Sequence, residues 1–341
     1  MRDSWGNVPA LTIFGKEITA FACLVVIGMA IGLMMALQRA EKNGVRKDSV
    51  LWFAIIGIPL GTFMAHLVYC QYYFDGLAKM ELGCLLHLDT GGFTMIGAIV
   101  GIGLSLVLCS FICQEKLIPL ADTLMPGLLL VLAMERFGEQ FTENGIGIEI
   151  TENWPILPLL VRTGPYENMQ TLAVNLLEGI TALAVAIAVQ RRERPAGQVA
   201  GAGMILVFAA QMVWESIRRD DRMMLDMASM LQVACGGMLL ILFAVCLFYR
   251  NASWQRSVAR LICLLISLGI FILMQFCMDG KIIPELSFEA CFALSCASAM
   301  LTAALCIREL KRATFAYSYT HKADRIEMLP TRSQIQPGLP A

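Results

Sequence analysis

One stretch of the sequence places acidic and basic side chains directly after a long apolar run. This stretch carries Glu135, Arg136, Glu139 and Glu143. If the helix continued through it, the three glutamates would recur every four residues along one face, with Arg136 on the neighbouring face. A guanidinium at this depth suits bidentate binding of a lipid phosphate, and a buried carboxylate can move a proton. The alternative is a salt-bridged, solvated helix end at the level of the lipid headgroups.

Three further places put ionisable groups inside or beside apolar runs. Glu215 and Arg218 stand three residues apart and can pair, with Trp214 at the interface, although an ordinary interfacial charge belt would look the same. Glu178 is a lone carboxylate within an apolar run and needs a partner or water. His66 is more typical of a hydrogen-bonded core histidine than of a base.

The composition indicates that water is not the main solvent of this chain, and it argues against one class of partner. Hydrophobic residues make up 57% of the 341 residues and charged residues 16%. A chain of this composition has far more apolar surface than one soluble core can bury. The net charge is −1 and the three histidines are scattered, so nucleic acid is not an expected partner. Nearly all of the cysteines lie in apolar runs without metal-ligand spacing. We expect neither a metal nor a cofactor.

Apolar runs long enough to cross a bilayer recur along the chain. A hydrocarbon core of about 30 Å requires about 20 apolar residues per helix. Small residues recur at helix-packing spacing, as in Gly28/Gly32 and Gly97/Gly101, and we expect them to bring helices close together. The sequence predicts an all-α polytopic membrane protein with about nine transmembrane helices, near residues 18–37, 50–73, 92–114, 119–136, 170–190, 198–215, 230–249, 258–278 and 286–306.

Positive charge alternates between the loops. Lys and Arg collect in residues 38–49, 190–197 and 249–260 and in the tail after Arg308, whereas the intervening loops are acidic or mixed. Because positive residues near span ends stay in the cytoplasm, the N-terminus is predicted outside and the C-terminus inside. The longest connection, about 137–169, then lies outside the cytoplasm and is expected to be interfacial or re-entrant.

Several short motifs occur in an order that resembles a known family. Gly91-Gly92-Phe93-Thr94 opens the third span, and Arg136-Phe137-Gly138 leads to Asn144-Gly145 after the fourth. Further matching motifs are Phe14-Gly15, the segment Gln38 to Gly44, Asp122 with Pro126, and Glu215-Ser216-Ile217-Arg218. Together they resemble the prolipoprotein diacylglyceryl transferases, over about residues 10–249.

The resemblance implies an activity, its partners and a site. Members transfer a diacylglyceryl group from phosphatidylglycerol to the lipobox cysteine of a prolipoprotein, in the bacterial cytoplasmic membrane. The expected partners are therefore phosphatidylglycerol or another anionic phospholipid, and the signal peptide of a prolipoprotein. The implied substrate-binding residues are Arg136, Gly138, Asn144, Gly91, Gly92, Glu215 and Arg218. The expected catalytic residues are Arg136, which stabilises the leaving phosphate, and Glu143 or Glu139, either of which could act as the base if it is buried.

The chain departs from the family pattern at three single positions and in its central signature, which is one residue longer than usual and has Ile146 where the closing glutamate should stand. Phe14 replaces a tyrosine, Ile96 a histidine and Gln211 an arginine. These replacements favour a second hypothesis, a non-catalytic lipid-binding membrane relative of the family. A third hypothesis is a secondary transporter that uses Glu178, Glu215 and the Glu135 to Glu143 row as a carboxylate relay, although no inverted repeat is evident.

The resemblance also divides the chain. Residues 1–249 are expected to form a seven-helix core that resembles the transferases, and residues 250–306 two additional helices. Residues 307–341 are expected to form a cytoplasmic tail. Since the candidate charges follow the fourth and sixth spans, the site is expected to face the extracytoplasmic side.

Overall fold

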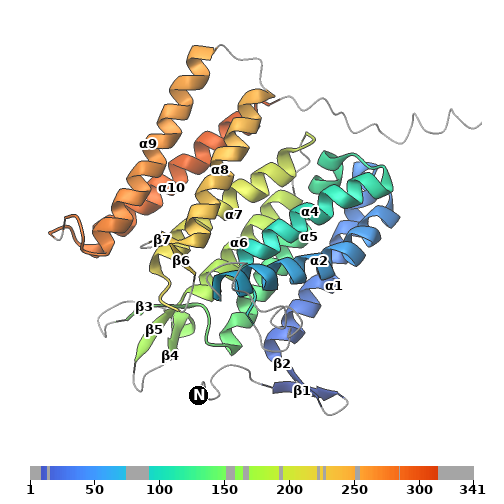
Figure 1. Cartoon of the computed structure of the whole chain (residues 1–341), viewed down its shortest axis with the longest axis horizontal. Helices are drawn as coiled ribbons and strands as arrows, with labels where there is room; N and C mark the ends of the chain where they lie inside the picture. The colour runs from blue at the N-terminus through green and yellow to red at the C-terminus, as the bar shows by residue number, and fades with distance from the viewer. Residues whose placement is uncertain are drawn as a thin grey trace, which may run out of the picture.

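The computed structural model is a bundle of long helices with short strands gathered at one end (Figure 1). The structure describes residues 9–13, 16–73, 92–150, 158–163, 169–191, 195–220, 223–225, 228–249, 254–283 and 285–313. Its helices are α1 (Ala20–Asn43), α2 (Lys47–Tyr73), α4 (Met95–Cys113), α5 (Leu117–Gly138), α6 (Val174–Gln190), α7 (Gln198–Ile217), α8 (Met230–Phe248), α9 (Trp254–Met278) and α10 (Phe288–Leu310).

Each helix coincides with one of the nine predicted spans. Among the described residues, eight helices are long and apolar enough to cross a membrane, and α6, with 17 residues, is shorter. The prediction of an all-α multi-pass membrane protein is therefore confirmed. The run predicted to begin at residue 170 becomes helical at Val174, because the four residues before it form a strand.

The short strands were not expected from the sequence. They are β1 (Pro9–Ile13), β2 (Lys16–Thr19), β3 (Ile146–Glu149), β4 (Val161–Thr163), β5 (Gln170–Ala173), β6 (Met224–Leu225) and β7 (Ala228–Ser229). β3, β5 and β4 form an antiparallel sheet, whereas the other strands pair as two hairpins. In the described part of the 137–169 connection, the chain forms β3, β4 and two 3-10 turns, η2 (Glu139–Phe141) and η3 (Pro158–Leu160). Its interfacial or re-entrant placement stays a prediction.

Glycines set the closest helix contacts, as their spacing predicts. α1 lies against α5 where Gly32 meets Gly127, and a Cβ on Gly32 would stand 2.7 Å from the Gly127 carbonyl oxygen. α4 lies against α2 in the same way, since a Cβ on Gly101 would stand 2.7 Å from Gly61 Cα. In lipid, where no hydrophobic effect drives helices together, such backbone contact supplies the packing energy.

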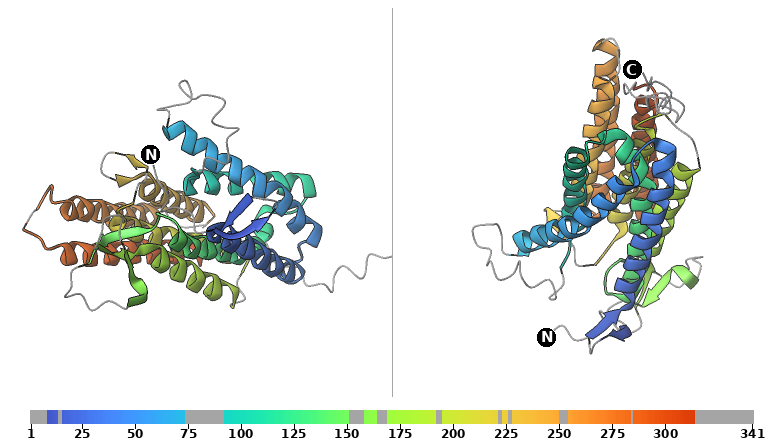
Figure 2. Two further views of the ribbon diagram at one scale, coloured as in Figure 1. Left: turned by 90° about the horizontal axis from the view of Figure 1, so that it is seen from below. Right: turned by 90° about the vertical axis from the view of Figure 1, so that its right-hand side faces the viewer.

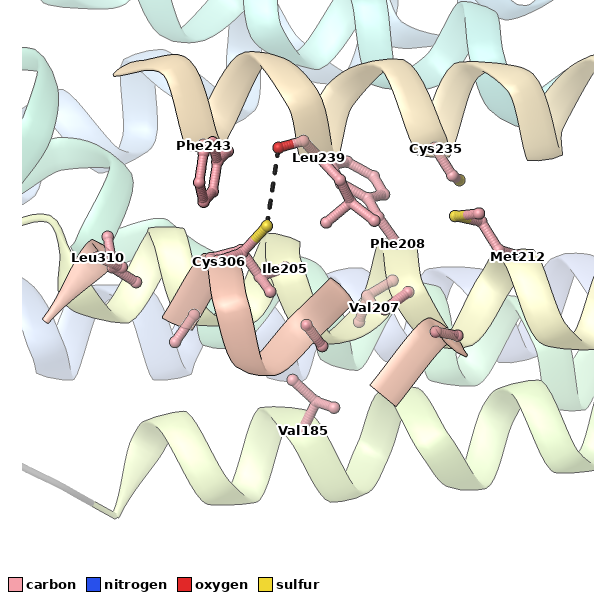
Figure 3. Close-up of a cluster of buried hydrophobic side chains, with 14 of the residues drawn as sticks. Val185, Ile205, Val207, Phe208, Met212, Cys235, Leu239, Phe243, Cys306 and Leu310 are labelled. Carbon is pink, nitrogen blue, oxygen red and sulfur yellow. Dashed lines mark hydrogen bonds between the residues drawn. The ribbon is translucent and has the colours of Figure 1, made fainter. Parts of the chain in front are cut away.

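The last two helices belong to the same core as the helices before them. The largest buried apolar cluster draws side chains from α5 through α10. Figure 3 shows Cys306 of α10 among Ile205 of α7 and Leu239 and Phe243 of α8, with its thiol donating to the Leu239 carbonyl at 3.8 Å. α9 packs along α10 and, in the views of Figure 2, both extend the bundle on the side of α8. The division into a seven-helix core and an extension stays a prediction.

The two ends of the bundle differ in kind. The described strands lie at the end where α5 and α7 finish and α6 begins (Figure 1). The loops that the sequence marks as basic, such as the one between Asn43 and Lys47, lie at the other end. The candidate site residues after α5 and α7 therefore meet at the strand end.

Candidate functional site

Three helix ends converge on Arg136, a side chain that is only 3% exposed. Its NH1 donates to Glu139 Oε1 at 2.5 Å, and its Nε lies 3.3 Å from Glu178 Oε2 and 3.4 Å from Glu135 Oε2. Its NH2 donates to Met95 Sδ at the start of α4. α5 thus places one guanidinium in the middle of three carboxyls.

A second buried arginine shares two of these carboxyl partners. Arg218, directly after α7, lies 3.1 Å from Glu178 Oε2 and 3.6 Å from Glu139 Oε2. It also binds Asp220 Oδ2 at 2.7 Å and lies 3.7 Å from Glu215 Oε1. We call the set formed by Arg136, Arg218 and these carboxyls the charge centre. Its members are Glu135, Arg136, Glu139, Glu178, Glu215, Arg218 and Asp220.

Glu178 joins the two halves of the charge centre. Its Oε2 lies against both guanidiniums, and its Oε1 accepts a hydrogen bond of 2.7 Å from the amide of Gln211. The Glu178 side chain is 1% exposed. The lone carboxylate that the sequence indicated in the fifth predicted span, which is α6, therefore has two arginines as partners, which its position in the chain does not reveal.

The backbone around the centre is fixed by a turn after α5. α5 ends at Gly138, which packs closely on Phe21 of α1, and η2 follows. Gly145 has φ +80° and donates its N–H to Asp220 Oδ2 at 2.6 Å. Only glycine readily adopts this backbone, and a Cβ there would also overlap Asn175.

This turn corrects one expectation. The glutamate row would lie on one face only if the helix continued, and it does not. Glu139 is 5% exposed and belongs to the centre, whereas Glu143 is exposed beyond η2. Since burial was the condition for a base, the geometry favours Glu139 over Glu143.

Arg162 of β4 secures the same turn from outside. Its NH1 donates to the carbonyl of Asn144 at 2.6 Å and to that of Glu139 at 3.2 Å. Burial lowers the pKa of Arg162, while Glu139, Asp220 and Glu143 partly oppose that shift. Asn144 thus takes part through its backbone, since its side chain is exposed.

Arg218 is a fixed cation. Burial acts to lower its pKa, but the neighbouring carboxylates of Glu178, Glu139 and Asp220 outweigh burial and raise the pKa well above its ordinary value. Its charge is therefore present at every physiological pH, so any change of charge in the centre must occur on a carboxyl group.

A small cavity of about 10 Å³ adjoins the centre. It is lined by Arg136, Glu178 and Gln211 on its polar side and by Leu132 and Trp214 among its apolar residues. This volume is about that of one water molecule, so a larger ligand requires the lining side chains to move.

Gly92, the described member of the expected glycine pair, lies three residues before the start of α4. Gly92 has φ +88°, its carbonyl accepts a hydrogen bond of 3.0 Å from His66 Nδ1, and Tyr69 packs against it. His66 is buried and hydrogen-bonded, as its sequence context predicted. Gly91 lies outside the described residues. Gly92 thus contacts His66 and Tyr69 of α2.

Comparison with known proteins identifies the lineage. The profile of the family described as "Prolipoprotein diacylglyceryl transferase" matches residues 9–274, more than half of the chain. This chain belongs to the prolipoprotein diacylglyceryl transferase family. The family match begins in β1 and ends within α9, so it extends beyond residue 249, where the sequence suggested that the resemblance stops.

Curated relatives of the prolipoprotein diacylglyceryl transferase family align over most of their length. Two proteins named phosphatidylglycerol–prolipoprotein diacylglyceryl transferase, from Clostridioides difficile and Finegoldia magna, are 25% and 24% identical over 218 residues. These alignments cover 63% and 62% of this chain and 84% of each relative. A Streptococcus mutans protein of the same name is 24% identical over 250 residues, which are 69% of this chain and 95% of the relative.

Sequence reasoning found part of the charge centre and missed part. It named Arg136, Glu139, Glu215 and Arg218, which the structure brings together, and Gly138, which packs beside them. It did not assign roles to three other groups. These are Asp220, hidden in the charge run after α7, Arg162, on a strand with no sequence signal, and Asn175, at the start of α6.

Proposed function

We propose that this chain transfers a diacylglyceryl group from phosphatidylglycerol to the lipobox cysteine of a prolipoprotein. Membership of the family and the shared name of its aligned relatives support this reaction. The observation that carries the proposal is the pairing of Arg136 and Arg218 in one buried centre, each bound to Glu139 and Glu178. Two guanidiniums at one site suit a phosphate diester, whose two non-bridging oxygens share one negative charge.

In this proposal Arg136 and Arg218 hold the phosphate and stabilise it as it leaves. The thiolate of the lipobox cysteine attacks the glycerol carbon that carries the phosphate ester, the C–O bond breaks, and glycerol phosphate departs. Charge on the departing phosphate oxygen is best stabilised by fixed cations in a site that excludes water. Exclusion of water also prevents hydrolysis, and both arginines are almost fully buried.

Proton transfer in this proposal falls to Glu139. Glu139 directly follows α5, and its carboxyl contacts both guanidiniums. Its distance to Arg136 is 2.5 Å. Glu143 is exposed and would meet a proton only at the surface. Gly138 and Asn144 act through the backbone, Gly138 by close packing and Asn144 through its carbonyl.

We further propose that the charge centre faces the extracytoplasmic side of the bacterial cytoplasmic membrane. The basic loops lie at the opposite end of the bundle from the strands and the centre. By the positive-inside rule, the basic end faces the cytoplasm. A prolipoprotein that had just crossed the membrane would then reach the centre with its signal peptide still in the bilayer.

A second candidate function is lipid binding without transfer. Gln211 and Ile96 replace an arginine and a histidine of the family pattern, and in the structure Gln211 Nε2 donates to Glu178. The centre therefore has one cation fewer than the pattern would supply. A protein of this kind would bind phosphatidylglycerol at Arg136 but release no glycerol phosphate.

The test is transfer of labelled diacylglyceryl by the purified chain in nanodiscs that contain phosphatidylglycerol, with a lipobox peptide as acceptor. The wild type is expected to modify the peptide, and Arg136→Ala to lower the rate about a thousandfold. Arg46→Ala is the control, because Arg46 is an exposed arginine at the opposite end. Binding without transfer would select the second candidate, and no effect of Arg136→Ala on an active wild type would remove the assigned phosphate site.

A further inference from the structure

The charge centre holds more negative than positive groups. Five carboxyls lie within 3.7 Å of the two guanidiniums. Arg162 is near as well, but its NH1 donates to two backbone carbonyls. If every carboxyl were ionised, the surplus would be at least two negative charges even with Arg162 counted. Like charges at this depth disfavour ionisation of at least one member of the group.

Hydrogen bonding singles out Glu139 within the centre. Its Oε2 is buried and has no hydrogen-bond donor, and the NH2 of Arg218 lies 3.6 Å away. Glu178 differs, because both of its oxygens accept hydrogen bonds. A buried acceptor without a donor costs about 1–3 kcal/mol, so an ionised Glu139 would be the least satisfied carboxylate of the set.

A second buried acceptor without a donor lies beside it. Asn175 is 0% exposed, and its Nδ2 donates to the Arg136 carbonyl and to Gln140 Oε1, while its Oδ1 has no donor. A Cβ on Gly145 would stand 3.0 Å from both Glu139 Oε2 and Asn175 Cγ. The two unsatisfied groups therefore flank one glycine. The cavity beside Arg136 is not lined by either of them.

We propose that Glu139 carries a proton in the resting protein. A hydrogen on Oε2 lowers the surplus charge, needs no cavity and converts the unsatisfied acceptor into a donor on the side where Asn175 lies. Oε1 still accepts from Arg136. The charged groups that face Glu139 come from α5, α6, α7 with the segment after it, and β4, and are Glu135, Arg136, Glu178, Glu215, Arg218, Asp220 and Arg162. From α1, the contact is the apolar Phe21.

If the proposed transfer reaction is correct, this proton fixes the order of events. Neutral Glu139 gives its proton to the phosphate oxygen as the C–O bond breaks. The resulting carboxylate takes the proton of the acceptor thiol as the sulfur forms the S–C bond at the same carbon, so that the sulfur attacks as a thiolate. In the net reaction, one thiol and one phosphate diester are converted to one thioether and one phosphate monoester, and Glu139 returns to its neutral form.

Infrared difference spectroscopy of the full chain in nanodiscs tests the protonation itself. The wild-type spectrum minus that of Glu139→Gln at neutral pH is expected to contain the carbonyl stretch of a protonated carboxylic acid, shifted in D₂O. Glu135→Gln is the matched control, since Glu135 contacts the same arginine but is 31% exposed, and it should leave this band in place. Absence of the band from the Glu139 difference spectrum would overturn the proposal.

A second readout separates this proposal from the transfer reaction. Glu139→Gln mimics the neutral acid, so the variant is expected to fold, to bind phosphatidylglycerol as the wild type does, and to lose transfer about a hundredfold. A Glu139 band in a wild type without transferase activity would leave the protonation standing and remove the reaction. Full transfer by a folded Glu139→Gln would overturn its role as the acid.

Discussion

Buried carboxylates lie at both ends of the bundle, and their oxygens are hydrogen-bonded to different degrees. At the basic end, Asp122 of α5 is 0% exposed, and its oxygens accept from the N–H groups of Gly197 and Ala200 at 2.6 and 2.7 Å. The carboxylate thus caps the start of α7, where backbone amides are unpaired and the helix dipole favours negative charge. At the strand end, Glu139 has a buried oxygen without a donor. The first arrangement stabilises a fold, and the second is expected where chemistry occurs.

The largest expected effect comes from removing the second cation of the charge centre. Arg218→Ala leaves Glu178, Glu139 and Asp220 with one cation fewer, so we expect the transfer rate to fall about a thousandfold. Arg219→Ala is the matched control, because Arg219 is the next residue but is exposed. The labelled-peptide assay measures both. Equal rates in the two variants would place the transfer site elsewhere.

Asp122→Ala should affect stability and not chemistry. Loss of two charge-assisted hydrogen bonds to buried amides is expected to lower the free energy of unfolding by about 3 kcal/mol. The measurement is thermal unfolding of the purified protein, with Asp122→Asn as a milder variant that keeps one acceptor. The rate per folded molecule should stay near that of the wild type. A stable but inactive Asp122→Ala protein would contradict the distinction between the two ends.

Glu178→Gln should have a smaller effect on the transfer rate, and it tests whether surplus negative charge keeps Glu139 protonated. The amide keeps one acceptor but removes one negative charge from between the two arginines, so we expect about a tenfold loss of transfer. Because the surplus charge falls, the protonated-carboxyl band of Glu139 should also weaken. An unchanged band would show that the charge of Glu178 does not set the protonation of Glu139.

Glu143→Gln should have the smallest effect. Its side chain is exposed, and exposed charges contribute little, so the transfer rate is expected to change less than twofold. The assay is the same, with Glu139→Gln measured beside it. If Glu143→Gln were instead the more damaging of the two variants, Glu143 would be the base, which is one of the two alternatives that the sequence offered.

The sequence predicts the helices well because each is a long apolar run bounded by charge or glycine. α1, for example, ends at Asn43, because the next residue, Gly44, has φ +67° and cannot continue the helix. The strands could not be predicted, since they have two to five residues and depend on pairing between distant segments. Nor does the sequence indicate that α10 packs against α7 and α8, because that contact depends on tertiary structure.

The charge centre was only half predictable for the same reason. Arg136 and Arg218 stand out because charge next to a span is costly and rare. Helical spacing put Glu139 and Glu143 on one face, and it failed because α5 ends at Gly138 and the chain turns at Gly145. The contacts of Glu178 with both arginines join three helices, so no local sequence pattern predicts them.

The measurement that tests the central claim most directly is a cryo-electron microscopy map of the protein in nanodiscs that contain phosphatidylglycerol. We predict headgroup density with its phosphate within hydrogen-bond distance of both Arg136 and Arg218, next to Glu178, at the strand end of the bundle. Ordered headgroup density elsewhere, with the two arginines still bound only to their carboxyl partners, would contradict the assignment of the charge centre as the lipid phosphate site.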